Sequence, residues 1–126
     1  MTRHIERQIL QLKELILHFG TMVEESISHS NIALFKQDLS LATKVIANDA
    51  EIDRMEVELE EECLKVLALY QPVAADLRFV VAVLKINNDL ERIGDLTSNI
   101  AKTVSQLAIT GPFELPQEIS IMAKQA

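Results

Sequence analysis

The sequence predicts an all-α protein, an up-down-up antiparallel bundle of three long helices with the start of a further helix at the C-terminus. Apolar residues recur at spacings near 3.5 residues through three long stretches, as on the buried face of a helix. Aromatic residues make up only 4% of the 126 residues, with 3 Gly and 3 Pro, which disfavours a β-sandwich or barrel. The stretches are joined by short connections, so consecutive helices must run antiparallel.

The first helix is expected from Thr2 to Phe35. The small residues Ser26, Ser30 and Ala33 continue its apolar stripe, where a neighbouring backbone can approach closely. The connection that follows offers Asp38 or Ser40 as the N-cap of the next helix. The apolar stripe of this first helix consists of Ile5, Ile9, Leu12, Ile16, Phe19, Val23, Ile27 and Leu34.

The second helix is expected from Leu39 to Tyr70. Pro72 disfavours the α conformation in the residue before it, which predicts a turn near Gln71 and Pro72. Cys63 lies on the apolar stripe and is interpreted as a core residue rather than a reactive thiol. The inner face is expected to comprise Val45, Ile52, Met55, Leu59, Cys63, Val66 and Tyr70.

The third helix is expected to begin by Asp76 and to run to Leu107. Residues 110–113 then stop it, and Pro116 suits the first turn of a further helix. Residues 1–109 are therefore interpreted as one three-helix repeat, and residues 110–126 as a linker and the beginning of a truncated second repeat. The expected stripe of the third helix is Phe79, Val83, Ile86, Leu90, Ile93, Thr97, Ile100, Val104 and Leu107.

Composition and charge narrow the expected function. With 12 Lys and Arg against 19 Asp and Glu, the net charge is -7, which repels phosphate backbones and argues against a nucleic-acid partner. The single cysteine fits a reducing cytosol, since it cannot form an internal disulfide. No apolar run is long enough for a membrane span, so we expect no direct membrane insertion.

Two pairs of acids share one spacing. Asp49 and Asp53 on the second helix, and Glu91 and Asp95 on the third, are each four residues apart and so share a helix face. Asp53 and Glu91 each lie 19 residues from Pro72, while Asp49 and Asp95 each lie 23 residues from it. A hairpin that turns at Pro72 would bring all four carboxylates to the same level.

Four such carboxylates favour a cation, because like charges at short range raise one another's pKa or recruit counter-ions. Oxygen donors without a thiolate suit hard cations, iron or manganese, and the acids lie off the apolar stripes, which predicts a surface metal site. The alternative is a set of solvated surface acids, partly paired with Arg54 and Arg92. Additional ligands or surrounding groups are drawn from four further residues: Glu56, Glu60, Asn88 and Asn99. The rest of the acidic run from Glu56 to Glu62 is interpreted as a solvated face.

The segments IANDAEID at 46–53, QPVAADLR at 71–78 and DLERIGD at 89–95 resemble the PhoU family of phosphate-uptake regulators. The resemblance extends from about Ile9 to Val104. It implies a PhoU-like three-helix repeat with metal ligands at four positions: Asp49, Asp53, Glu91 and Asp95. The family binds iron, zinc or other divalent metals, and manganese or magnesium would also suit these donors. Where the family often has His-Ala after the last acid, this chain has Leu96 and Thr97, which removes a potential ligand.

The family's second segment includes Asp76, which could cap the third helix, and Arg78, which could tie the turn or meet a partner, as could Arg92. The resemblance also implies a metal-binding negative regulator that is not an enzyme. Its expected partners are the ATPase subunit of the phosphate ABC transporter and a membrane sensor histidine kinase, which would recruit it peripherally to the membrane. A homodimer is expected to replace the second repeat that family members carry.

Two other functions remain open from sequence. One is a carboxylate-bridged di-metal oxidase of the ferritin-like kind, which would need ligands from four helices and Glu-x-x-His motifs that this chain lacks. The other is a purely structural helical interaction module, in which the acids bind nothing.

Overall fold

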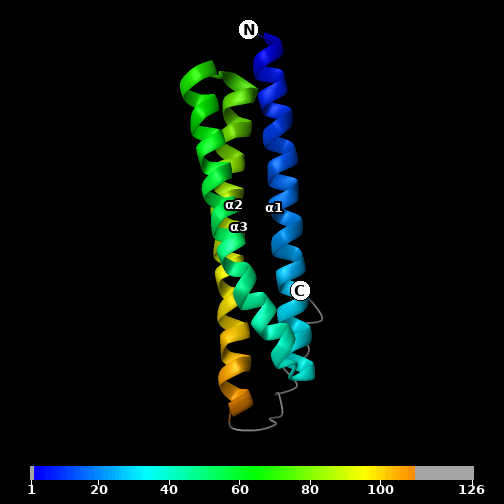
Figure 1. Ribbon diagram of the computed structural model, residues 1–126. Coiled ribbons are helices and arrows are strands. Elements are labelled where there is room, and N and C mark those ends of the chain that lie inside the picture. Colours follow the sequence, from blue (N-terminus) through cyan, green and yellow to red (C-terminus); the bar gives the residue numbers. More distant parts are fainter. Residues whose placement is uncertain (1, 110–126) are drawn as a thin grey trace. The chain divides into compact units, whose positions relative to one another are not determined.

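The computed structural model describes residues 2–109, which form three helices and no strand (Figure 1). These are α1 (Thr2–Lys36), α2 (Leu39–Tyr70) and α3 (Ala74–Ile109), in up-down-up order. The predicted three-helix bundle is confirmed, with helix ends within about two residues of those expected. No helix in this part of the chain has the length and apolarity needed to cross a membrane. The predicted linker and further helix at 110–126 lie outside the described residues.

The connection between α1 and α2 is closed by Asp38. Its backbone N–H donates to the carbonyl of Ala33 at 3.0 Å, and the preceding Gln37 has a φ of 54°, as at the left-handed end of a helix. Its side-chain Oδ1 accepts the N–H of Leu41 at 3.0 Å and so caps the start of α2. Asp38, rather than Ser40, is therefore the cap.

The connection between α2 and α3 turns at the buried residue Pro72, as predicted. Gln71 has a φ of 44° and Ala74 a φ of 51°, so the chain reverses through two left-handed residues. Asp76 was expected as a cap, but α3 begins earlier, and Asp76 lies within its first turn. There its carboxylate favours the positive end of the helix dipole. Asp76 and Arg78 are both exposed.

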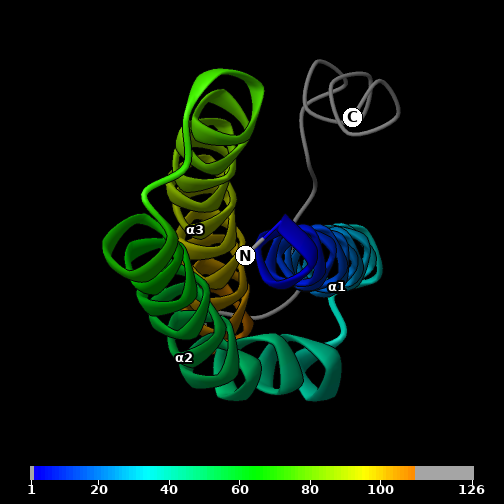
Figure 2. The ribbon, with the colours of Figure 1, turned by 90° about the horizontal axis from the view of Figure 1, so that it is seen from above.

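The described residues divide into two compact units. The first comprises residues 2–23 and 50–93, so that each of the three helices contributes a segment. Figure 2 shows this unit end-on, with the three segments around a common interior. Its core is built from large apolar side chains, most of them predicted from the stripes: Leu12, Phe19, Val23, Ile52, Met55, Leu59, Cys63, Val66, Val80 and Val83.

The second unit comprises residues 24–49 and 94–109. Its core is made of small apolar residues: Ala33, Ala42, Val45, Ala101 and Val104. Hydroxyl groups add to it. The Oγ atom of Ser26 and the Oγ1 atom of Thr97 lie 2.7 Å apart, and Thr97 donates to the carbonyl of Gly94 at 2.8 Å. A hydroxyl has one proton, so Ser26 donates to Thr97.

The stripe predicted for α3 is partly wrong. Ile86 and Ile93 are 46% and 37% exposed, although they were expected in the core. The interior face of α3 instead includes residues that are small or polar: Val80, Asn87, Gly94, Ser98 and Ala101. The large apolar residues alone therefore do not identify which face of α3 is buried.

Candidate functional site

The hairpin formed by α2 and α3 in the first unit has the register expected from the acid spacing. Asn87 is fully buried on α3, and its Nδ2 donates to the backbone carbonyl of Glu56 on α2 at 3.0 Å. Because Asn87 and Glu56 lie 15 and 16 residues from Pro72, the two helices fold back almost symmetrically. Asp53 and Glu91 lie about one turn beyond this bond and so occupy the same level of the hairpin.

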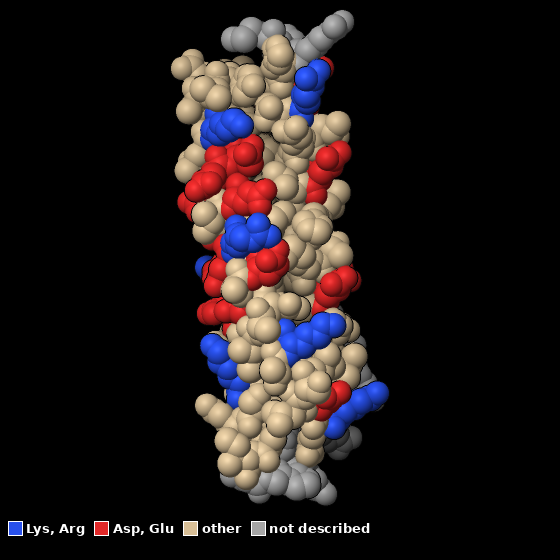
Figure 3. Space-filling model, viewed as in Figure 1, with Lys and Arg blue, Asp and Glu red and all other residues tan. Residues whose placement is uncertain are grey.

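Four carboxylates lie along this hairpin, near enough for their charges to act on one of them. The pKa of Glu56 is raised above its ordinary value, first by burial and then by the charges of three neighbours: Glu60, Glu91 and Asp53. Two of these lie on α2 and one on α3, so the negative charge comes from both helices. We call Asp53, Glu56, Glu60 and Glu91 together the acidic flank. On the face of the molecule in view, Figure 3 shows acidic side chains over the middle of α2, with basic side chains among them.

The basic residue nearest in sequence to Asp53 pairs elsewhere. Arg54 forms an ion pair with Glu51, four-fifths of a turn before it on the same helix, and both side chains are more than half exposed. The hydrogen bond and charge of Arg54 lower the pKa of Glu51. The alternative to a metal site included a pairing of Arg54 with the acid quartet, but Arg54 pairs with Glu51 instead. Arg92 is exposed on α3.

The donor set of the acidic flank fits a hard cation, since it consists of carboxylate oxygens alone. Within residues 2–109, no group of three or more His, Cys, Asp or Glu side chains is close enough to hold one metal ion. Asp53 and Glu60 are exposed and Glu56 and Glu91 half-buried, so these side chains have room to change rotamer around an ion.

The remaining residues of the predicted site are distributed as follows. Asp49 is half-buried on α2 and Asp95 is exposed on α3, and both belong to the second unit. Asn88 in the first unit and Asn99 in the second are exposed. The convergence of Asp49, Asp53, Glu91 and Asp95 on one cation stays a prediction, as does the contribution of the two asparagines.

Sequence reasoning missed a second group of acids. Glu58 and Glu62, interpreted as part of a solvated face, line a hollow between α2 and α1. On α1 this hollow is lined by Glu14 and by His18 one turn later. The sequence does carry a signal for this hollow. Glu14 and His18 on the first helix, and Glu58 and Glu62 on the second, are each four residues apart, and an antiparallel pair of helices can bring the two sets to one side.

Comparison with known proteins gives a consistent picture. A family model described as the PhoU domain matches residues 16–104. A phosphate-specific transport system accessory protein PhoU homolog of Aquifex aeolicus is 38% identical over 118 residues, which cover 94% of this chain and 53% of that protein. The PhoU protein of Escherichia coli is 36% identical over 107 residues, or 82% of this chain and 44% of its own. The chain spans about half the length of the curated relatives it matches.

Proposed function

Since the chain belongs to the PhoU family, we propose that it acts as an accessory regulator of phosphate transport and not as an enzyme. The observation that carries the proposal is the match of the PhoU domain to residues 16–104, which includes the whole α2–α3 hairpin up to Val104. The relatives are named as accessory proteins of a phosphate-specific transport system. The acidic flank on that hairpin is the feature through which we expect it to act.

The proposed regulator works through other proteins. It would bind the ATPase subunit of the phosphate ABC transporter and a sensor histidine kinase, and so restrain uptake and keep the starvation response off when phosphate is plentiful. We place it on the cytoplasmic side of the membrane, recruited there by these partners. We also propose that it pairs with a second copy of itself.

A divalent or ferric cation is part of the proposal. Asp53 and Glu91 would hold it, with Asp49 and Asp95 as the other ligands and Glu56 beside them. The carboxylate oxygens suit iron, manganese or magnesium, and zinc remains a candidate from the resemblance. The cation would neutralise a surface on which burial, and then the charges of its acidic neighbours, raise the pKa of Glu56. The chain itself would supply the donor atoms and a rigid helical hairpin.

Metal binding is tested by equilibrium dialysis against Mn²⁺ and Fe²⁺, with elemental analysis of the protein. The double variant Asp53→Asn/Glu91→Gln should bind at least about tenfold more weakly. The matched control Glu24→Gln/Glu25→Gln removes two exposed carboxylates of α1 and should bind as the original chain does. Equal binding by all three proteins would reject the acidic flank as the metal site.

Regulation is tested in bacteria that lack their own PhoU protein. Expression of the chain at high phosphate should lower both phosphate uptake and the activity of a phosphate-starvation reporter. The Asp53→Asn/Glu91→Gln variant should lower them less than the control variant does. Unchanged uptake and reporter activity with the original chain would reject the regulatory function. Steady oxygen consumption by the purified protein with ferrous iron would instead support a di-metal oxidase.

A further inference from the structure

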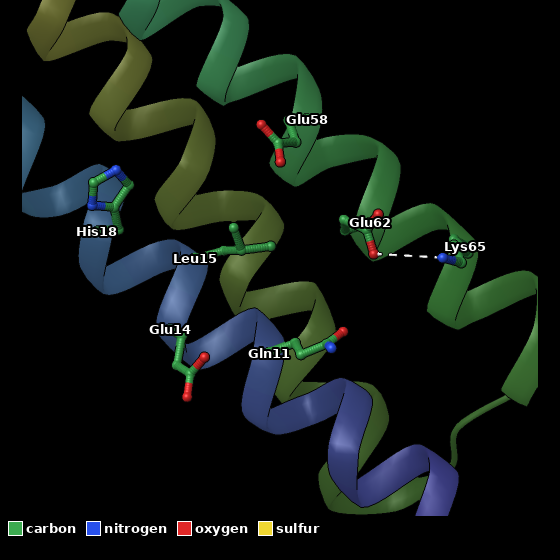
Figure 4. Close-up of a pocket in the computed structure, with 7 residues that line it drawn as sticks. All are labelled: Gln11, Glu14, Leu15, His18, Glu58, Glu62 and Lys65. Atoms are coloured by element: carbon green, nitrogen blue, oxygen red, sulfur yellow. Dashed lines mark ion pairs between the residues drawn. The ribbon is translucent and has the colours of Figure 1, made fainter.

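A groove lies between α1 and α2 in the first unit, away from the acidic flank. It has a volume of about 460 Å³, within the range of protein binding pockets. The lining residues follow one another at helical spacing on each wall, with Glu14 and His18 on α1 and Glu58, Glu62 and Lys65 on α2. Figure 4 shows these side chains on the two helices: Leu15 extends from α1 towards α2, whereas Glu14 points away from α2.

The groove carries a net negative charge on a partly apolar surface. Three acidic residues line it, Glu14, Glu58 and Glu62, whereas Lys65 is the one Lys or Arg among its lining residues. The Nζ atom of Lys65 lies 3.9 Å from Oε2 of Glu62, and the Lys65 side chain is 52% exposed. A solvent-exposed ion pair at that distance contributes little, so another cation can replace Lys65 at Glu62.

The carboxylates of this groove are distributed over both of its walls, which suits an extended occupant better than a single ion. No three acidic or histidine side chains in the described part of the chain are close enough to chelate one ion, and this includes the groove. Carboxylates spread along both walls instead match several cationic groups spaced along a chain. Guanidinium and ammonium groups also have apolar stems, which would lie against Leu15. Bidentate contacts from arginine would be stronger than the present contact of Lys65 with Glu62.

We propose that the α1–α2 groove is a docking site for a basic segment of a partner protein, whose Lys or Arg side chains contact Glu14, Glu58 and Glu62. The charge complementarity of the groove, rather than its shape alone, identifies this occupant. The inference deepens the proposed regulatory function, on which it rests for the existence of a protein partner. Peptide binding in solution can nevertheless be measured without any phosphate response, so the two can fail separately.

The test uses hexa-arginine labelled with a fluorophore, and hexa-citrulline as an uncharged probe of the same shape. Fluorescence anisotropy should show binding of hexa-arginine that weakens with added salt, and none of hexa-citrulline. Glu58→Gln/Glu62→Gln should weaken binding about five- to tenfold, whereas Glu24→Gln/Glu25→Gln, which removes equal charge elsewhere, should change it less than about twofold. Lys65→Gln should strengthen binding about twofold, since it removes the competing cation. Amide NMR shifts should change at residues 11–18 and 58–65.

Several results would overturn the proposal. Equal weakening by the two glutamate pairs would show general attraction to an acidic protein. Equal binding of hexa-citrulline would remove charge as the basis of recognition. Weaker binding by Lys65→Gln, or shift changes confined to residues outside the groove, would place the occupant elsewhere. Circular dichroism of each variant confirms that the helices are intact before binding is compared.

Discussion

The cores of the two units differ in the kind of side chain they bury. In the first unit, Phe19, Leu12 and Leu59 are at most 1% exposed and fill the space between the helices. Among the described residues of the second unit, the fully buried side chains are alanines, valines and hydroxyl residues, and the larger Leu34, Leu41 and Ile46 pack against them only partly buried. Ser30 and Ser98 illustrate the difference, since both lie in the second unit and are at most 2% exposed.

This difference predicts two kinds of stabilisation along the same three helices. Burial of large apolar side chains contributes about 25 cal/mol per Å² to the free energy of unfolding, and the three largest fully buried side chains, Phe19, Leu12 and Leu59, lie in the first unit. Small residues allow helix backbones to approach closely but bury less area. Hydroxyl groups among them must also keep their hydrogen bonds. We therefore expect large-to-small changes to be most damaging in the first unit, and small-to-large changes to be damaging in the second.

The largest effect is expected for Phe19→Ala in the first unit. Removing a fully buried phenyl ring leaves a cavity and should lower the free energy of unfolding by about 3–5 kcal/mol. Urea unfolding followed by circular dichroism measures it. Leu17→Ala on the same helix is the control, since Leu17 is 71% exposed and its loss should cost at most about 0.5 kcal/mol. A small effect of Phe19→Ala would contradict the comparison.

A small-to-large change tests the second unit. Ala101 is 0% exposed, so Ala101→Leu should force its neighbours apart and cost about 1–3 kcal/mol of unfolding free energy. The same change at exposed Ala82 on α3 should alter stability by at most about 0.5 kcal/mol. If Ala101→Leu stabilised the protein, the second unit would contain space that close helix packing does not explain.

The hydroxyl pair of the second unit gives a smaller effect. Ser26→Ala removes the donor to Thr97 and should cost about 1 kcal/mol of unfolding free energy. Thr97→Val should cost more, because it also removes the bond to the carbonyl of Gly94. Ser28→Ala, at an exposed position of α1, is the control for helix propensity. Thermal unfolding ranks the three variants, and no difference between them would show that the hydroxyls are not needed.

The smallest effect tests electrostatics in the first unit. Because the pKa of Glu56 is raised in the folded protein, folding favours its protonated form, and ionised Glu56 is unfavourable at neutral pH. Glu56→Gln should therefore stabilise the protein by roughly 0.5 kcal/mol at pH 7. The advantage should shrink as the pH falls towards the ordinary value of 4.5, where the wild-type carboxyl is protonated as well. Urea unfolding at several pH values measures it, and a destabilised variant at pH 7 would be the contrary result.

How well the sequence predicted each helix depended on which residues face the core. On α2 the apolar stripe from Val45 to Val66 is buried as expected, because large apolar residues mark that face. Cys63 lies within it, and burial with the charges of Glu62 and Glu60 raises its thiol pKa to about 11, as suits an unreactive core residue. On α3 the inner face is marked by Asn87 and small residues, which periodicity of large side chains cannot reveal.

The candidate site was likewise predictable only in part. The symmetry of Asp53 and Glu91 about Pro72 predicted their common level, and the bond from Asn87 to Glu56 confirms that register in the first unit. The pairing of Arg54 with Glu51 was not predictable, because several acids lie within its reach along the helix. The groove next to Glu58 could not be predicted from the acid spacing on α2 and α3, because it is formed by the packing of α1 against α2.

The joint at Asp38 limits how the length of this chain can change. One residue ends α1 through its backbone and starts α2 through its side chain, so the joint has no spare residue. An insertion there would rotate the beginning of α2 by about 100° and turn Ala42 and Val45 away from their partners in α3. Asp38 thus fixes the rotation of α2 relative to α1. Insertions and deletions should be better tolerated at positions that do not both end one helix and cap the next.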